Sequence, residues 1–265
     1  MSDIDIRGGG SARRARERLA VAGRAAIAAL VLALAWAGAA ALVRKPFLPS
    51  PWAAGSRLVS RIADGSLAAH LGASAGRVGL ALLLSAPPAA LLGLAAGRSR
   101  RADGLASPFV YLLHPIPKAA FMPVIMLFLG LGDASKVFLI GLIVFGQLFV
   151  SARDAARAVP PDLVDSVRSL GAGRAAIARH VVLPAALPAL LSALRTALGT
   201  AVAVLFLAET FASESGLGWY IVDAWTRVDY ADTYAAIVAL ALFGLACYAS
   251  VDLAEAAFCR WREVD

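Results

Sequence analysis

The sequence predicts an all-α membrane protein with about six transmembrane helices, both termini in the cytoplasm and a cytoplasmic loop that carries a short helix. The chain of 265 residues is 60% hydrophobic and 16% charged, which is more apolar surface than a soluble domain can bury. Apolar runs of roughly twenty residues, the length needed to cross a bilayer, recur along it. Arginines gather in short tracts between these runs, which is typical of loops retained in the cytoplasm.

The net charge of +7 does not indicate a nucleic-acid partner, because the arginines that supply it lie in these separate tracts. Cys247 and Cys259 lie in or beside the last apolar run, which favours two small buried thiols over a disulfide. No His and Cys residues have metal-ligand spacing, so we expect no metal site. The chain also lacks the phosphate-binding pattern G-x-x-x-x-G-K-[ST], so any ATP hydrolysis belongs to another subunit.

The N-terminal segment, residues 1–20, is polar and contains five arginines, which predicts a mostly disordered cytoplasmic tail before a transmembrane domain over residues 21–265. Residues 22–43 are long enough for a first span. A signal peptide cleaved near Ala39 is the alternative. We disfavour it because the apolar run is longer than a usual signal core and five further spans follow.

Residues 44–69 are predicted to form an external loop with a short interfacial helix, and the second span covers about 70–97. Glycines that let helices approach closely lie on two faces of this span, Gly72, Gly76 and Gly79 on one and Gly93 and Gly97 on the other. The third span, about 105–131, contains four prolines and should break near residues 115–117. Such a break is tolerated only where protein or a water-filled cavity surrounds it.

The rest of the chain continues the alternation of apolar spans and polar loops. A fourth span covers residues 135–151 and a fifth covers about 186–208. The external segment 209–232 has two tryptophans and two tyrosines, which suits an interfacial re-entrant helix. A sixth span, about 233–257, returns the chain to the cytoplasm. With six spans every arginine-rich tract lies on the cytoplasmic side.

Between the fourth and fifth spans lies the charged stretch DLVDSVRSLGAGRAAIARHVVLPAALP, residues 162–188. Four apolar residues recur there at helical spacing, Leu163, Val164, Val167 and Leu170. Gly171 and Gly173 interrupt the helix. A short amphipathic helix between membrane spans suits docking onto a soluble partner.

This stretch resembles the EAA loop of ABC-importer permeases, in which E-A-A is followed by a glycine and then by I-x-L-P. The corresponding residues are the triplet Asp165-Ser166-Val167, then Gly171, and finally Val181, Leu183 and Pro184. The glycine and the Leu-Pro pair match, whereas the triplet is substituted. The resemblance extends from about residue 65 to the end, and it is strongest to the subgroup that imports nitrate, taurine and aliphatic sulfonates.

The resemblance implies a multi-pass subunit of the bacterial inner membrane that pairs with a second copy of itself. It also implies two ATP-binding cassette subunits, which hold ATP and Mg, and a periplasmic or lipid-anchored substrate-binding protein. The chain itself would hold no cofactor. Its coupling loop, about 153–185, would contact the ATPase through Leu163, Val164, Asp165, Val167, Leu170, Gly171, Leu183 and Pro184.

Four ionisable residues within or beside the spans are candidates for the translocation path, because charge in a bilayer is costly and usually functional: His114, Lys118, Arg195 and Glu209. Lys118 follows the expected break and would favour an anion. Snorkelling or a carboxylate partner is the alternative for Lys118, and packing against another helix is the alternative for Arg195. Glu209 would be part of an outer gate or simply solvated.

The function predicted is therefore the permease subunit of an ATP-driven importer for a small anion such as a sulfonate, taurine or nitrate. The same type of importer for a thiamine-pyrimidine or riboflavin-like precursor is the alternative substrate hypothesis. A channel without an ATPase would be favoured by inverted repeats, of which the sequence has none visible. A membrane-embedded enzyme would need a convergent acid–base group that no spacing predicts.

Overall fold

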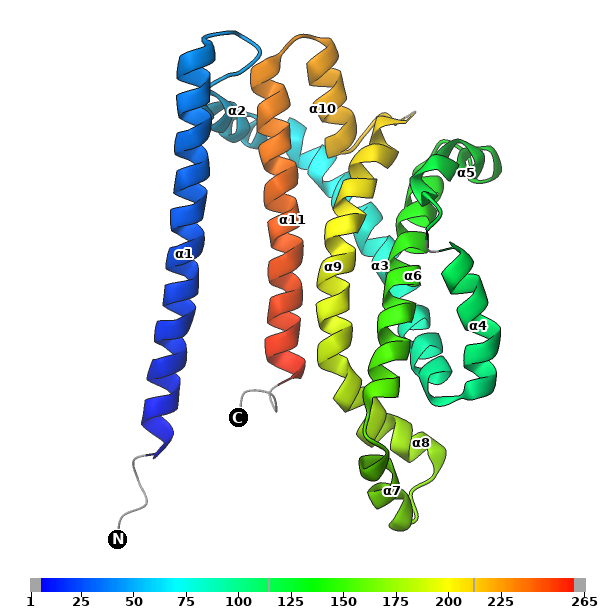
Figure 1. The fold of residues 1–265 in the computed structure, drawn as a ribbon. Helices are drawn as coiled ribbons and strands as arrows, with labels where there is room; N and C mark the ends of the chain where they lie inside the picture. Colours follow the sequence, from blue (N-terminus) through cyan, green and yellow to red (C-terminus); the bar gives the residue numbers. More distant parts are fainter. Residues whose placement is uncertain (1–5, 114, 212, 260–265) are drawn as a thin grey trace.

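The computed structural model describes residues 6–113, 115–211 and 213–259, and this part of the chain is helical throughout its regular segments (Figure 1). Five long helices are joined by shorter ones. The elements in order are α1 Ile6–Val43, α2 Pro51–Ala63, α3 Ser66–Arg98, α4 Arg100–Leu113, η1 Lys118–Phe121, α5 Met122–Leu129, α6 Asp133–Ala158, α7 Pro161–Ser169, α8 Arg174–Ile177, the π-turn η2 Ala178–Val182, α9 Leu183–Thr210, α10 Leu217–Thr226 and α11 Tyr230–Phe258.

Five segments are long and apolar enough to cross a membrane, which confirms an all-α membrane protein: Gly23–Val43, Ser66–Arg98, Asp133–Ala158, Arg174–Thr210 and Tyr230–Phe258. They correspond to the predicted spans one, two, four, five and six. One prediction for the N-terminus was wrong. Helix α1 begins at Ile6, so most of the segment expected to be disordered is helical.

The predicted third span is divided, as its prolines indicate. Helix α4 ends at Leu113, and regular structure resumes only at Lys118 with η1 and α5. Pro115 and Pro117 lie in the non-helical gap, where their missing backbone donors interrupt no helical ladder. Pro123 lies in the first turn of α5, a position that tolerates proline. The two halves together make a sixth crossing plausible.

Helices α3, α6 and α9 form the centre of the molecule (Figure 1). The close approach of α3 to α6 depends on Gly93 and Gly97, as predicted. A Cβ atom at Gly93 would lie 2.6 Å from the Ala152 Cβ, and one at Gly97 would lie 2.7 Å from the Ala156 Cβ. On the other glycine face of α3, a Cβ atom would meet nothing within 4 Å among the residues that the structure describes.

The remaining elements gather at the two ends of these helices. Helices α2 and α10 lie together at one end, and α7 and α8 lie at the opposite end, to which α11 also descends (Figure 1). The predicted external loop and outer segment therefore share one end, and the motif loop occupies the other. Helix α1 lies at the periphery, where Trp36 stacks on Tyr234 and its Nε1 donates to the Pro49 carbonyl at 3.0 Å.

Candidate functional site

The motif loop folds as a helical hairpin beneath the central helices. Helix α7 starts with Pro161 at its first turn, directly after α6 ends. Gly171 then has φ +86°, in the left-handed region that glycine adopts without strain. Its N–H donates to the Arg168 carbonyl at 2.9 Å, and the Ala172 N–H donates to the Val167 carbonyl at 3.4 Å. This pair of bonds is a Schellman motif, which satisfies the last carbonyls of α7.

One face of α7 is fixed to its own chain. Val164 is 2% exposed and packs in a cluster with Ile177 of α8 and Val182 of the π-turn. Val167 lies against the same cluster and is partly buried. The inward valines hold the helix against the end of α6, α8 and the π-turn that leads into α9, and the rest of the surface of α7 faces outward.

The exposed surface of α7 carries two leucines and an ion pair. Leu163 is 52% exposed and Leu170 is 86% exposed. The Arg168 Nη1 lies 2.7 Å from the Asp165 Oδ1, with both side chains more than 60% exposed. The four residues expected to form one docking stripe therefore divide into two inward valines, of which Val164 is buried and Val167 partly buried, and two exposed leucines.

The return from the loop to the fifth span passes through the π-turn. Pro184 lies in the first turn of α9 and has no N–H to donate to a carbonyl four residues earlier. A π-turn skips one such bond, so Ala178–Val182 lets helical geometry continue from α8 into α9. Leu183, the first residue of α9, is 41% exposed.

Lys118 lies where the broken third span resumes. It lines a cavity of about 270 Å³ between η1, α6 and α9, together with Gln147 and Thr200. Gln147 Nε2 donates to Thr200 Oγ1 at 3.2 Å. Lys118 is the only charged side chain among the described residues that line this cavity. His114 lies outside the described residues.

Glu209 is neither solvated nor on a surface. It is 0% exposed at the outer end of α9, and its Oε1 lies 2.6 Å from the Nη1 of Arg77 on α3. Ser74 donates its hydroxyl to the same carboxylate at 2.8 Å, and the Gly218 N–H donates to Oε2 at 2.8 Å. The carboxylate therefore ties α9 to α3 and to the start of α10.

Arg77, to which no role was assigned from the sequence, lies at the centre of this cluster of contacts, which we call the outer hub. The side chain is 4% exposed and also lies 2.7 Å from Asp133 at the start of α6. Its guanidinium donates to the Ser215 carbonyl and hydroxyl, each at 2.8 Å. One buried cation thus joins α3, α6, α9 and the segment before α10.

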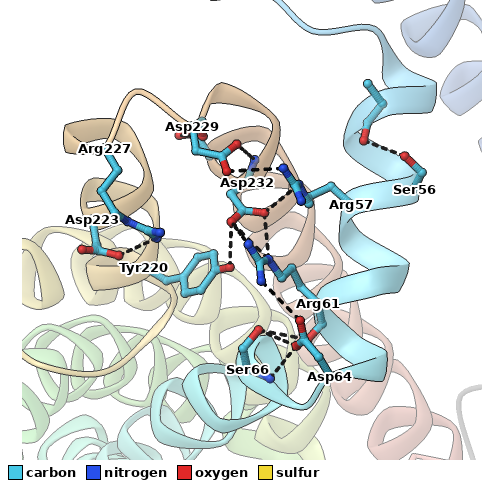
Figure 2. A network of polar contacts seen from close by, with 12 residues as sticks. Ser56, Arg57, Arg61, Asp64, Ser66, Tyr220, Asp223, Arg227, Asp229 and Asp232 are labelled. Carbon is cyan, nitrogen blue, oxygen red and sulfur yellow. Dashed lines mark hydrogen bonds and ion pairs between the residues drawn. The ribbon is translucent and has the colours of Figure 1, made fainter.

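A second outer network joins α2 to α10 and α11 (Figure 2). Arg57 and Arg61 of α2 point toward Asp232, which is fully buried, and the Arg61 Nη2 lies 2.7 Å from its carboxylate. This bond to Asp232 raises the pKa of Arg61. The Tyr220 hydroxyl donates to the same carboxylate at 3.3 Å, and burial raises the pKa of Tyr220. Helices α2, α10 and α11 are therefore held together by polar contacts to one buried carboxylate.

Arg195 meets another helix, which was one of the two arrangements expected. Its guanidinium pairs with Asp252 and lies 2.9 Å from Glu255, both on α11. The residue is thus occupied within the chain by two carboxylates. The Arg195 Nε is buried without a hydrogen-bond partner in the described part of the chain.

The family model of the binding-protein-dependent transport system inner membrane component matches residues 89–263, more than half of the chain. The chain belongs to this family. The permease is 32% identical over 202 residues to the taurine transport system permease protein of Escherichia coli K12, and the alignment covers 74% of each chain. It is 31% identical over 225 residues to a putative aliphatic sulfonates transport permease protein of Bacillus subtilis 168, covering 85% of this chain and 82% of the relative.

Membership settles the general function. The permease is a multi-pass transport subunit of the inner membrane and is not an enzyme. It belongs to an importer that also comprises an ATPase and a substrate-binding protein. A riboflavin transport system permease protein of Chloroflexus aurantiacus is a more partial match, 30% identical over 155 residues and 58% of each chain.

Sequence reasoning missed several residues of the permease because their partners are distant. Arg77 and Glu209 are 132 residues apart, and Arg61 and Asp232 are 171 apart. A usable signal existed for the first pair. Both are lone charges near the outer ends of predicted spans, where opposite charges on adjacent helices commonly pair. Gln147 and Thr200 gave no such signal, since single polar residues are frequent in transmembrane helices.

Proposed function

We propose that the permease forms, with a second copy of itself, the membrane path of an importer for a small anion of the sulfonate, taurine or nitrate kind. Two ATP-binding cassette subunits, holding ATP and Mg, drive it, and a periplasmic or lipid-anchored binding protein delivers the solute. The observation that carries the proposal is the outward face of α7. Leu163 and Leu170 are exposed on a helix whose other face is fixed to its own chain.

This arrangement suits mechanical coupling. A helix that is packed against the end of α6 and the π-turn leading into α9 can transmit a push to both long helices, because its inward valines cannot slide independently. Exposed leucines at the end of the molecule are unfavourable in water and suit a groove on a soluble partner. The Schellman motif at Gly171 fixes where α7 ends and thereby how Leu170 is presented.

The coupling test is co-purification of the tagged permease with its ATPase. We expect a Leu163→Ser/Leu170→Ser double variant to retain at least tenfold less ATPase than the wild type while still inserting into the membrane. A Ser166→Ala/Ser169→Ala double variant is the matched control, since both serines are exposed on the same helix, and it should retain the partner. Full ATPase retention by the leucine variant would show that α7 is not the docking element.

The anionic substrate is supported by the names of the relatives and by Lys118, the one charged side chain among the described residues that line its cavity. We expect proteoliposomes containing the permease, the ATPase and the binding protein to take up taurine or ethanesulfonate when ATP is supplied. Lys118→Ala should lower this uptake at least tenfold, and Lys118→Arg should retain most of it. Uptake of riboflavin, but of neither sulfonate nor nitrate, would favour the vitamin-precursor alternative.

A further inference from the structure

The cavity beside Lys118 has a polar wall inside an otherwise apolar bundle. Its volume of about 270 Å³ is slightly below the range of pockets that hold drug-sized ligands, so it suits a smaller solute. Its polar lining residues come from three elements, Lys118 from η1, Gln147 from α6 and Thr200 from α9. The remaining lining is apolar or glycine: Ile116, Pro117, Ala119, Ile143, Gly146 and Val204.

The hydrogen bonds of this wall show which end of the Gln147 amide meets Thr200 in the absence of solute. The Thr200 hydroxyl donates to the Thr196 carbonyl at 3.4 Å, so its single proton is used. Thr200 Oγ1 can then only accept from Gln147, which must present its NH₂ group at 3.2 Å. The amide oxygen of Gln147 consequently points away from Thr200.

That oxygen has no partner. The Gln147 Oε1 is buried and accepts no hydrogen bond from any described residue of the chain. Leaving a buried acceptor unpaired is destabilising, and such atoms usually meet a donor from water or from a ligand. The residues that line the cavity therefore include one cation, Lys118, and one amide, Gln147, whose oxygen is unpaired among the described residues.

We infer that this cavity is a solute subsite for a small zwitterion that carries an anionic group and an amine, such as an aminosulfonate. The anionic group would bind the Lys118 ammonium. The amine would donate an N–H to the Gln147 Oε1, after a rotation of the amide toward the solute. This inference rests on the proposed function, since it assigns residues to the path of an anion importer.

The subsite distinguishes solutes that have an N–H donor for Gln147 from solutes that have none. A site built around an unpaired polar group rejects an analogue that cannot pair with it. Taurine has the amine, whereas ethanesulfonate is the same alkyl sulfonate without it. Gln147 is therefore a specificity residue for the amine, and Lys118 serves both solutes.

The first test is ATP-driven uptake of taurine and of ethanesulfonate into proteoliposomes with the complete importer. The Gln147→Leu variant should lower taurine uptake at least tenfold and leave ethanesulfonate uptake within twofold of wild type. Gln147→Asn keeps a neutral amide acceptor and should retain more taurine uptake than Gln147→Leu. Thr196→Val, whose exposed side chain lies outside the cavity lining, is the control and should change neither solute. An equal loss of both solutes in Gln147→Leu would assign Gln147 a merely structural role and overturn the inference.

A second test needs neither transport nor a binding protein. In a Cys247→Ala/Cys259→Ala background, Thr200→Cys is labelled with 2-sulfonatoethyl methanethiosulfonate in permease–ATPase nanodiscs. Millimolar taurine should slow labelling at least fivefold and ethanesulfonate should slow it less, and adding Gln147→Leu should abolish the difference. Absent uptake of any anion overturns the proposed function. Intact uptake with no protection by taurine overturns the subsite alone.

Discussion

The outer hub around Arg77 and the loop around α7 use charge in opposite ways. At the hub, Arg77 and Glu209 are 4% and 0% exposed and are surrounded by further donors and acceptors. On α7, Asp165 and Arg168 pair in the open with more than 60% of each side chain exposed, and the helix is held instead by Val164. The outer end is fastened by buried ion pairs, whereas the loop is seated by apolar packing and keeps its polar surface available.

This difference predicts that removing one charge lowers the free energy of unfolding strongly at the hub and hardly at all on α7. Arg77→Met leaves Glu209 buried without its cation, and breaking such a pair costs about 3 to 5 kcal/mol. Arg168→Met breaks an exposed pair and should cost at most about 1 kcal/mol. The free energy of unfolding in mixed micelles measures both.

A double variant sharpens this prediction. Arg77→Met/Glu209→Leu removes the stranded charge and should recover part of the loss, because apolar replacement of a whole buried pair is often tolerated. If Arg77→Met and Arg168→Met are equally stable, the hub does not fasten the outer end. If the double variant is as unstable as Arg77→Met, the cost comes from lost contacts to Ser215 and Asp133 rather than from an unpaired carboxylate.

Glycines in the two regions offer a second contrast. Gly216 has φ +109°, and a Cβ there would overlap the Glu209 carboxylate and the Arg77 guanidinium. Gly171 has φ +86°, but a Cβ would meet nothing within 4 Å. Gly216→Ala should therefore cost about 2 to 4 kcal/mol, from backbone strain and overpacking together, and Gly171→Ala about 1 kcal/mol from strain alone.

The same unfolding measurement decides between these values, with Gly104→Ala as a control in open space at negative φ. If Gly216→Ala and Gly171→Ala lower the free energy of unfolding equally, the side chains of the hub can move to accommodate an added methyl group. The buried pair would then be less rigid than its bonding suggests.

Within the loop, the comparison becomes one between two adjacent residues of α7. Val164→Ala removes buried methyl groups and should destabilise the protein by about 2 kcal/mol. Leu163→Ala, at 52% exposure, should change stability by at most about 0.5 kcal/mol and act on ATPase retention instead. If Leu163→Ala unfolds the loop and Val164→Ala does not, then Leu163 and not Val164 lies on the inward face of α7.

Sequence patterns predicted the elements better than their contacts. Hydropathy and arginine tracts predicted six spans, five of which are long apolar helices, and prolines located the break in the third before Lys118, because both signals follow from local chemistry. Helical spacing predicted that α7 is amphipathic. It did not predict that Val164 would be buried and Leu163 exposed. Which of two neighbouring apolar residues is buried depends on how the helix packs against the rest of the chain. The hub depends on contacts between helices far apart in sequence, and although its charges could be noticed in the sequence, no local pattern encodes which of them pair.

The smallest predicted effect concerns the turn between α2 and α3, at the outer end. Asp64 accepts from the Ser66 hydroxyl at 2.6 Å and from its N–H at 2.9 Å. These bonds, with a smaller contribution from Arg61, hold the pKa of Asp64 below its usual 3.8. A carboxylate with a lowered pKa in the folded state stabilises the fold above its usual pKa, and this contribution is lost as the pH falls through the folded value.

Asp64→Asn should therefore lower the thermal midpoint slightly at pH 6, and the difference from wild type should narrow as the pH falls to 3. Ser66→Ala removes the strongest donor and should show a similar loss with the same narrowing. A difference that stays constant from pH 6 to pH 3 would mean that the turn depends on the shape of Asp64 and not on its charge. The exposed turn would then resemble the loop around α7, where an ion pair in the open contributes little to stability.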